Sequence, residues 1–323
     1  MALGLADVEV GTWTSPDRVS GCTVVLPPPG ALGAVAVRGQ SPGIRLAASL
    51  GPTGKLTVCH GVVLAGSSLY GMAAADGVTS WLERQGIGYP VGDALVPIVG
   101  AAILLDRGVA APTQRPDAIA GIEACEAATS RDPQEGSVGA GTGCTIAKVG
   151  GLEHAWRGGQ GIAVRRVGDL VVGAIVANNA VGELRADDGT WLARARIDDD
   201  QPRYPLVDPP WLEVPPAREQ AGGAGANTVI GCIVTNARLD KVAAWRVADL
   251  AHAGIDRAVR PANTYFDGDA LFCLATGHVD AHHDRVVHLA TEAIADAARR
   301  GPLAAVAGGD LPALRDVRGD AGQ

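Results

Sequence analysis

The sequence predicts an α/β fold. Short apolar runs bounded by glycine and proline, as expected of buried strands, alternate with alanine-rich stretches that have helical spacing. The 323 residues are 47% hydrophobic, which is enough to bury a large core in one big domain or two small ones. Forty-four glycines and an aromatic content of only 4% predict tight backbone approaches and a core of small aliphatic side chains. We expect a single domain that comprises residues 1–323.

The N-terminal half is predicted to begin with strands and to continue with helices. Apolar segments at 22–27, 33–39 and 56–66 are separated by glycine and proline, so they are expected to be core strands. An alanine-rich helix is expected from Tyr70 to Leu82, closed by Gly86. A second helix is expected from Pro116 to Ala128, with its proline in the first turn.

The C-terminal half is predicted to alternate in the same way around a charged connector. Residues 170–178 and 229–234 are apolar runs typical of strands buried on both faces, whereas the charged, proline-rich residues 183–226 predict an exposed connector. Asn236 is the expected N-cap of a helix, and the last helix is expected to stop at Gly301-Pro302. The first of these helices is expected to bury Leu239, Ala243, Val247, Leu250 and Gly254, and the second Val286, Leu289, Ala290, Ala293 and Ala297.

Charge and hydropathy argue against nucleic acids and membranes as partners. The net charge is -8 and the acidic and basic residues are interspersed, so no basic stripe is available for a polyanion. The longest apolar run, around Val96 to Leu105, is too short to span a bilayer, and the first residues lack the features of a secretion signal. A soluble, cytoplasmic protein is therefore expected.

No cofactor or metal is predicted. The six cysteines are scattered singly in apolar segments, which is typical of small buried side chains rather than of disulfides or a zinc site. The cluster GAGTGC lacks the spacing of a dinucleotide-binding loop, and GPTGK at 51–55 lacks that of a phosphate-binding loop. The glycines between 136 and 161 are therefore expected to allow close backbone approach instead. A histidine- and aspartate-rich stretch fits no metal motif and is expected to be a solvated loop; its members are His278, Asp280, His282, His283 and Asp284.

Thr228 is the first candidate for a catalytic residue. It stands at the mouth of the predicted strand 229–234, directly after a glycine-rich approach that ends at Asn227. A threonine hydroxyl becomes a useful nucleophile when a base lies beside it, and the free amine of an N-terminal threonine can be that base. This chemistry would require a cut between Asn227 and Thr228. The alternative is an ordinary loop that runs into a strand.

Several blocks of sequence resemble the family of DmpA-type aminopeptidases and nylon-oligomer hydrolases, which are self-processing enzymes with an N-terminal nucleophile. The resemblance extends over residues 20–280, with the blocks in the same order. They are LAGSSLYGMAAADGV from 65, VGAGTGCTIAKVGG from 138, GGQGIAVRRVGDLVVGAIVANNAVG from 158, NTVIGCIVTNARLDK from 227 and RPANTYFDGDALFCLATG from 260. The resemblance implies a four-layer αββα sandwich, a cut into fragments 1–227 and 228–323, and assembly as homo-oligomers, commonly tetramers.

The resemblance also assigns roles to single residues. Thr228 matches the nucleophile, and Asp267 and Asp269 match the paired aspartates of the DGD motif, which would hold and tune the Thr228 amine. Lys148 matches a site lysine that would stabilise negative charge, and Asn179 matches an asparagine that would donate to an oxyanion. A pocket tyrosine that orients the substrate matches Tyr70. Without the resemblance these residues would be a solvated turn, a surface lysine, a satisfied loop asparagine and a core ring.

The expected activity is hydrolysis of an amide bond through an acyl-enzyme. Asn227-Thr228 and the GQGIAVRRVGD block are closer to the nylon-oligomer branch, the 6-aminohexanoate-oligomer endohydrolases, so the expected substrates are small peptides or linear amide oligomers. Valine at 229, where a second threonine is common, changes the fine geometry of the expected pocket. The alternatives are an aminopeptidase with D-esterase activity, a β-peptidyl aminopeptidase, an acyltransferase with the same nucleophile, or an uncut binding protein.

Overall fold

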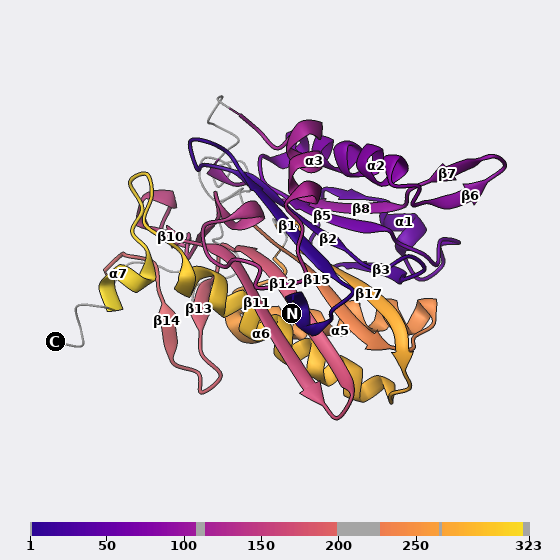
Figure 1. Ribbon diagram of the computed structural model, residues 1–323. Helices are drawn as coiled ribbons and strands as arrows, with labels where there is room; N and C mark the ends of the chain where they lie inside the picture. The colour runs from indigo at the N-terminus through magenta and orange to yellow at the C-terminus, as the bar shows by residue number, and fades with distance from the viewer. Residues whose placement is uncertain (1, 108–113, 199–226, 265–266, 319–323) are drawn as a thin grey trace.

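The computed structural model describes residues 2–107, 114–198, 227–264 and 267–318. Two five-stranded sheets pack face to face (Figure 1). The first has the order β1-β2-β5-β8-β4, with bounds Glu9–Thr14, Gly21–Leu26, Gly61–Ala65, Val99–Ile103 and Ile44–Arg45. The second has the order β11-β12-β15-β17-β3, with bounds Gly159–Val167, Leu170–Asn179, Thr228–Ala237, Ala270–Val279 and Leu32–Val37.

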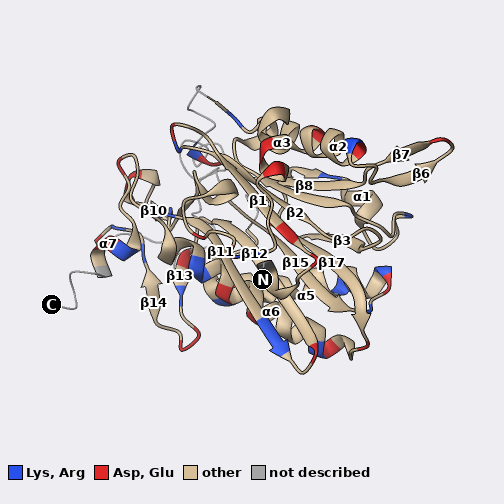
Figure 2. Cartoon of the chain, in the orientation of Figure 1, with Lys and Arg blue, Asp and Glu red and all other residues tan. Residues whose placement is uncertain are grey.

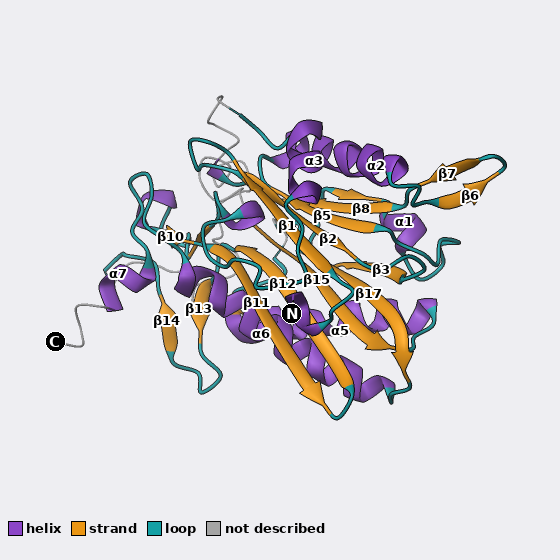
Figure 3. Ribbon diagram, in the orientation of Figure 1, coloured by secondary structure: helices purple, strands orange, loops and turns teal. Residues whose placement is uncertain are grey.

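Helices cover the outer face of each sheet, as the ribbon coloured by secondary structure shows (Figure 3). The first sheet packs against α2 (Ala74–Arg84) and α3 (Ala118–Glu126), and the second against α5 (Lys241–Ala258) and α6 (His283–Ala304). Three apolar clusters lie between these four layers, one inside each pair of neighbouring layers. The predicted four-layer αββα sandwich is confirmed.

Most predicted elements lie where the sequence indicates them. The apolar runs at 22–27, 33–39, 170–178 and 229–234 correspond to β2, β3, β12 and β15, and the helix expected at 70–82 is a 3-10 helix, η2 (Ser68–Ala73), that continues into α2. The six cysteines are buried and form no disulfide bonds. The histidine-rich stretch is exposed, but it is a loop only at 280–282, because His278 lies in β17 and His283 begins α6. The ring of His282 accepts from the Asp284 backbone N–H and thus caps α6.

Two expected helix boundaries are wrong. Asn236 belongs to β15, and the N-cap of α5 is Asp240, whose carboxylate accepts from the Ala243 backbone N–H at 2.7 Å. Helix α6 continues through Pro302 to Ala304. Proline lacks the N–H that would bond the carbonyl four residues earlier. That carbonyl, of Ala298, accepts instead from Asn178 Nδ2 at 2.8 Å, so the helix loses little by carrying the proline.

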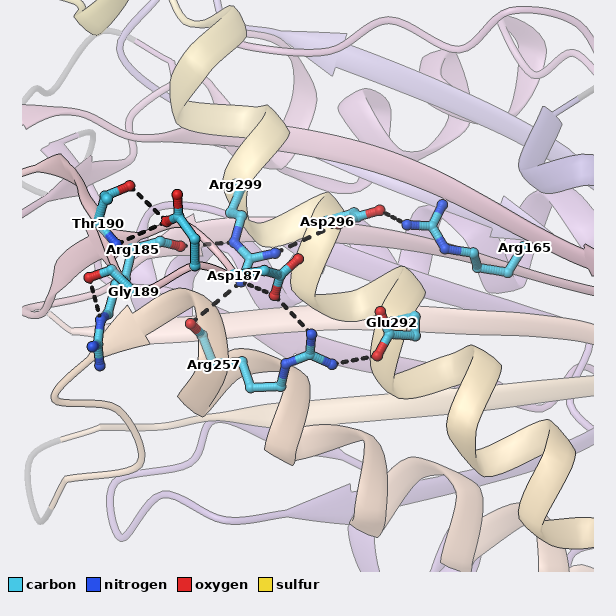
Figure 4. Close-up of polar contacts among 10 residues, drawn as sticks. Arg165, Arg185, Asp187, Gly189, Thr190, Arg257, Glu292, Asp296 and Arg299 are labelled. Carbon is cyan, nitrogen blue, oxygen red and sulfur yellow. Dashed lines mark hydrogen bonds and ion pairs between the residues drawn. The ribbon is translucent and has the colours of Figure 1, made fainter.

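The predicted connector is structured in its first part. Residues 183–198 contain β13 (Glu183–Arg185) and β14 (Trp191–Ala193), which form a hairpin, and β13 also pairs with β16 (Val259–Arg260). Asp187 in the turn binds Arg257 of α5 at 2.7 Å and Arg299 of α6 at 2.8 Å (Figure 4). The hairpin is therefore tied to the helical layer. Residues 199–226 of the connector lie outside the described residues.

Close backbone approach accounts for the glycines at 158–161. A Cβ atom on Gly161 would lie 2.0 Å from the Ala297 carbonyl oxygen, and one on Gly301 would lie 2.4 Å from the Gly159 carbonyl oxygen. Helix α6 can thus lie directly on β11 because glycines meet at the contact.

Besides these strands and helices, the described residues contain several short elements. They are η1 (Ala2–Gly4), α1 (Ala47–Leu50), β6 (Tyr89–Val91), β7 (Ala94–Val96), η4 (Gly139–Gly141), β9 (Thr145–Ile146), η5 (Leu152–His154), β10 (Trp156–Arg157) and α7 (Leu314–Arg318). Charged residues lie mainly on helices, turns and strand ends, while the sheets are largely free of them (Figure 2). Among the residues described, no helix is both long enough and apolar enough to cross a bilayer.

Candidate active site

The Asn227-Thr228 bond lies between two strands of the second sheet. Thr228 is the first residue of β15 and pairs with Asn179, the last residue of the antiparallel neighbour β12. On the other side β15 runs parallel to β17, and a β-bridge joins Asn227 to Asp267 just before the two strands begin. This parallel arrangement places the DGD turn directly beside the bond, with Asn227 and Thr228 only 3% and 6% exposed.

The carbonyl group of Asn227 is contacted by two donors. The Thr228 hydroxyl donates to this carbonyl oxygen, and so does the Gly268 backbone N–H, at an N···O distance of 3.3 Å. The hydroxyl of Thr228 and the carbonyl that precedes it are thus already in contact in the uncut chain.

Asp267 and Asp269 are both buried, and backbone N–H groups hold them in place. Asp269 accepts from Val229 at 2.6 Å and from Asn263 at 3.1 Å, while Asp267 Oδ2 accepts from Thr264 at 2.5 Å. Asp267 Oδ1 is buried and has no hydrogen-bond partner among the described residues. One carboxylate oxygen beside Asn227-Thr228 is therefore available to a further donor.

Burial shifts the proton affinities of both aspartates. Removal from water raises the pKa of Asp269 to about 8, and the nearby charge of Asp267 acts in the same direction. Burial also raises the pKa of Asp267, although the backbone and hydroxyl of Thr264 and the charge of Lys148 oppose the rise. Asp269 therefore favours its protonated form at neutral pH.

Lys148 approaches Thr228 from the β12 side. Its ammonium donates to the Asn179 backbone oxygen at 2.8 Å, and Asn179 is the residue that pairs with Thr228. Burial lowers the pKa of Lys148 to about 7, and the ionised forms of Cys144, Asp267, Asp106 and Asp269 act against that shift. Lys148 is thus a cation that can lose its proton near neutral pH.

The side chain of Asn179 is oriented by contacts on both ends. Its Oδ1 accepts from the Thr145 backbone N–H at 2.9 Å, and its Nδ2 donates to the Leu105 carbonyl at 3.0 Å. One amide N–H is therefore used within the fold, and the same contacts fix the backbone oxygen that binds Lys148.

Tyr70 lies on the surface, unlike the buried residues described above. It lies in η2, its side chain is 60% exposed, and the guanidinium of Arg115 stacks on its ring at 3.9 Å from the centroid. It is thus not a core ring. The start of η2 is nevertheless attached near the site, because Ser68 donates its N–H to the Leu104 carbonyl at 2.9 Å.

One buried carboxylate in this region was not singled out from the sequence. Asp106 follows the end of β8 by three residues and is 6% exposed, and its charge acts on Lys148, Arg157 and Cys144. The sequence carried a signal for it, because a polar residue directly after the apolar run 96–105 is a natural site position.

Comparison with known proteins gives consistent matches over most of the chain. Residues 4–309 match the sequence model of peptidase family S58. An uncharacterized aminopeptidase of Mycobacterium tuberculosis is 39% identical over 268 residues, 80% of this chain and 74% of the relative. A 6-aminohexanoate-oligomer endohydrolase of Agromyces sp. is 32% identical over 278 residues, 84% of this chain and 74% of the relative.

Two solved structures have the same fold at low sequence identity. A β-aminopeptidase of Burkholderia sp. has a TM-score of 0.70 at 19% identity, with 99% of this chain and 94% of the other covered. The L-aminopeptidase D-Ala-esterase/amidase of Ochrobactrum anthropi, described as a new variant of the Ntn hydrolase fold, has a TM-score of 0.67 at 18% identity, with 94% and 85% covered. The fold is therefore of the Ntn hydrolase type.

Proposed function

The chain belongs to peptidase family S58 and is a hydrolase of amide bonds, and from this premise we propose that Thr228 is its nucleophile, freed when the chain cleaves itself after Asn227. The observation that carries the proposal is the contact between the Thr228 hydroxyl and the Asn227 carbonyl oxygen, beside a buried carboxylate oxygen of Asp267 that has no partner among the described residues.

The first reaction is the cut. Thr228 Oγ1 attacks the carbonyl carbon of Asn227, and the Gly268 N–H, which already donates to that carbonyl oxygen at 3.3 Å, stabilises the negative charge that develops there. The C–N bond to Thr228 then breaks while its nitrogen gains a proton, which leaves an ester between Asn227 and the Thr228 hydroxyl. Water hydrolyses this ester, so Asn227 ends as a carboxylate and Thr228 as a free amine.

Turnover uses the same hydroxyl with its new base. The Thr228 amine takes the hydroxyl proton as oxygen attacks the substrate carbonyl, and it returns a proton to the leaving amine. The acyl-enzyme is then hydrolysed by water. A free amine needs acceptors to fix its direction, and Asp267 Oδ1 offers one beside the bond that is cut. Asp269 supports the geometry by binding the Val229 N–H at 2.6 Å.

Lys148 is proposed to act as a cation that stabilises the tetrahedral oxyanion. Its ammonium is held by the Asn179 backbone, one strand away from Thr228. A positive charge in a buried site stabilises developing negative charge far more than it would in water. Asn179 is proposed to assist by holding Lys148 and by bordering the substrate.

The proposed substrates are small peptides or linear amide oligomers. The relatives named above are an aminopeptidase and an endohydrolase of 6-aminohexanoate oligomers, so both α-peptides and ω-amino-acid oligomers are candidates. Tyr70, exposed and close to the segment that leads to Asp106, is proposed to contact the substrate. Product masses from an N-terminally blocked and a free oligomer distinguish endo from exo cleavage.

Intact mass and N-terminal sequencing of the purified protein test the nucleophile. We expect two fragments, 1–227 and 228–323, the smaller beginning with Thr228, and we expect Thr228→Ala to remain one inactive chain. Thr228→Ser is the matched control, because it keeps the hydroxyl and should still cut. A smaller fragment that begins at another residue, or an active full-length chain, would remove Thr228 from the role.

A further inference from the structure

Asp106 is held in the interior by donors from two separate segments. Its Oδ1 accepts from the Ser67 backbone N–H at 2.9 Å, and its Oδ2 accepts from the Ser20 hydroxyl at 2.8 Å. The Ser67 hydroxyl in turn donates to Ser20 at 3.0 Å. Ser67 adopts a left-handed conformation, with φ of 62°, which few residues other than glycine adopt without cost. Several local features thus serve to fix one carboxylate.

Two glycines make the space that Asp106 occupies. A Cβ atom on Gly66 would lie 2.0 Å from Asp106 Oδ2, and one on Gly143 would lie 2.4 Å from the same oxygen. Neither glycine has a left-handed φ, so neighbouring atoms and not the backbone conformation restrict both positions. At Gly66 the nearest atom is the carboxylate oxygen, whereas at Gly143 the Val19 carbonyl oxygen, at 2.3 Å, is as close as the carboxylate. Burying a carboxylate costs free energy unless nearby groups compensate its charge. The charged groups around Asp106 therefore indicate its function.

A short chain of contacts links Asp106 to Lys148. The carbonyl of Leu105, the residue before Asp106, accepts from Asn179 Nδ2 at 3.0 Å. The backbone oxygen of the same Asn179 accepts from Lys148 Nζ at 2.8 Å. The segment that carries Asp106 is thus connected through Asn179 to Lys148.

We propose that Asp106 is a positioning residue of the active site, which keeps Lys148 protonated by its charge and keeps Asn179 in place through the Leu105 carbonyl. The charged and titratable groups that act on Lys148 are Asp267, Asp269 and Cys144 besides Asp106. The charge of Asp106 also acts on Arg157, which is buried. This inference rests on the proposed function only for the role of Lys148.

The effect of the Asp106 charge on Lys148 can be measured as a change in the proton affinity of Lys148. Burial favours the neutral amine of Lys148, and each nearby carboxylate favours the ammonium. Asp106→Asn keeps the shape and one acceptor oxygen but removes the charge. The proton affinity of Lys148 should then fall about tenfold, the lower end of what one opposite charge at close range produces.

The chain has only three lysines, at 55, 148 and 241, so NMR of protein labelled at the lysine ε-carbon can follow each one separately. The titrations are done on the full chain carrying Thr228→Ala, with and without Asp106→Asn, and Lys55→Arg and Lys241→Arg assign the signals. Glu183→Gln is the control, because Glu183 is another buried carboxylate and its oxygens bind the Arg194 guanidinium and the Ala195 N–H.

We expect the Lys148 titration to move to lower pH in Asp106→Asn and to stay unchanged in Glu183→Gln. If Asp106→Asn does not fold, Asp106→Ser carries the same test with a smaller neutral side chain. An unchanged Lys148 titration in a folded neutral variant overturns the inference, even if the wild-type chain cuts itself before Thr228. A wild-type chain that stays uncut overturns the proposed function and leaves the titration test intact.

Discussion

Gly39 is not one of the proposed catalytic residues, yet we predict that Gly39→Ala will disable the site. A Cβ atom on Gly39 would lie 2.0 Å from the Asp267 carbonyl oxygen and 2.5 Å from the Asp269 nitrogen. Real Cβ atoms keep at least 3.0 Å, so the DGD turn must move away by about 1 Å. A misplacement of about 1 Å in a catalytic group costs about 100-fold in rate, or about 2.7 kcal/mol. The crowding should also lower the free energy of unfolding by about 1–3 kcal/mol.

The assay for Gly39→Ala is the half-time of conversion from full-length chain to two fragments, read by gel electrophoresis and intact mass. Far-UV circular dichroism and thermal melting establish that the variant is folded at the assay temperature. Gly61→Ala is the control, because a Cβ atom there meets its nearest neighbours at 3.5 Å, an ordinary contact. A folded Gly39→Ala chain that cuts within threefold of the wild-type rate would refute the placement of the DGD turn.

Three further predictions concern the buried charges. Asp267→Ala and Asp269→Ala should each slow cutting and turnover by about 100-fold while the chain stays folded, and unchanged rates in both would reduce the DGD turn to a structural element. Lys148→Met, which keeps length without charge, should slow cutting about 100-fold in the same assay; wild-type kinetics would exclude Lys148 from oxyanion stabilisation. In the uncut Thr228→Ala chain, burial raises the pKa of Asp269 from 3.8 to about 8, so folding takes up a proton in this range. The stability this provides is fully present below pH 3.8 and is lost as the pH rises toward 8. Urea denaturation between pH 4 and 6.5, below the pKa of about 7 for Lys148, should show this loss, and Asp269→Asn should reduce the slope. Equal slopes would mean that Asp269 is ionised in the folded chain.

The elements that build the site could be predicted largely because they are strongly apolar. The run 229–234 has no polar residue and lies in a strand buried on both faces, so Thr228 at its mouth could be placed correctly. The strand-helix-strand order from Thr228 to Val279 also favours the parallel neighbours that bring Asn227 to Asp267, 40 residues later. Which carboxylate oxygen of Asp267 has no partner among the described residues depends on the Thr264 N–H, which binds the other oxygen, and this could not be predicted.

Other features depend on contacts between distant segments. Asn236 and Asp240 are both good capping residues, but the side chain of Asn236 binds the Val171 N–H and the Asp169 carbonyl, so Asp240 is the residue that caps the helix. A Gly-Pro pair is a common stop signal for helices. Here the side-chain amide of Asn178 donates to the Ala298 carbonyl in place of the N–H that Pro302 lacks. The first part of the connector is ordered because Asp187 binds arginines from two helices, which no local pattern indicates.

The order of strands in the second sheet has a consequence for the physical behaviour of the cut protein. Strands β15 and β17 from the C-terminal part lie between β12 and β3 from the N-terminal part, so the two pieces would share one continuous ladder of backbone hydrogen bonds. Separating the pieces would mean opening the apolar interior, so dissociation and denaturation would be a single event. Reassembly would then be bimolecular, and the melting temperature of the cut protein should rise with its concentration, unlike that of the uncut Thr228→Ala chain.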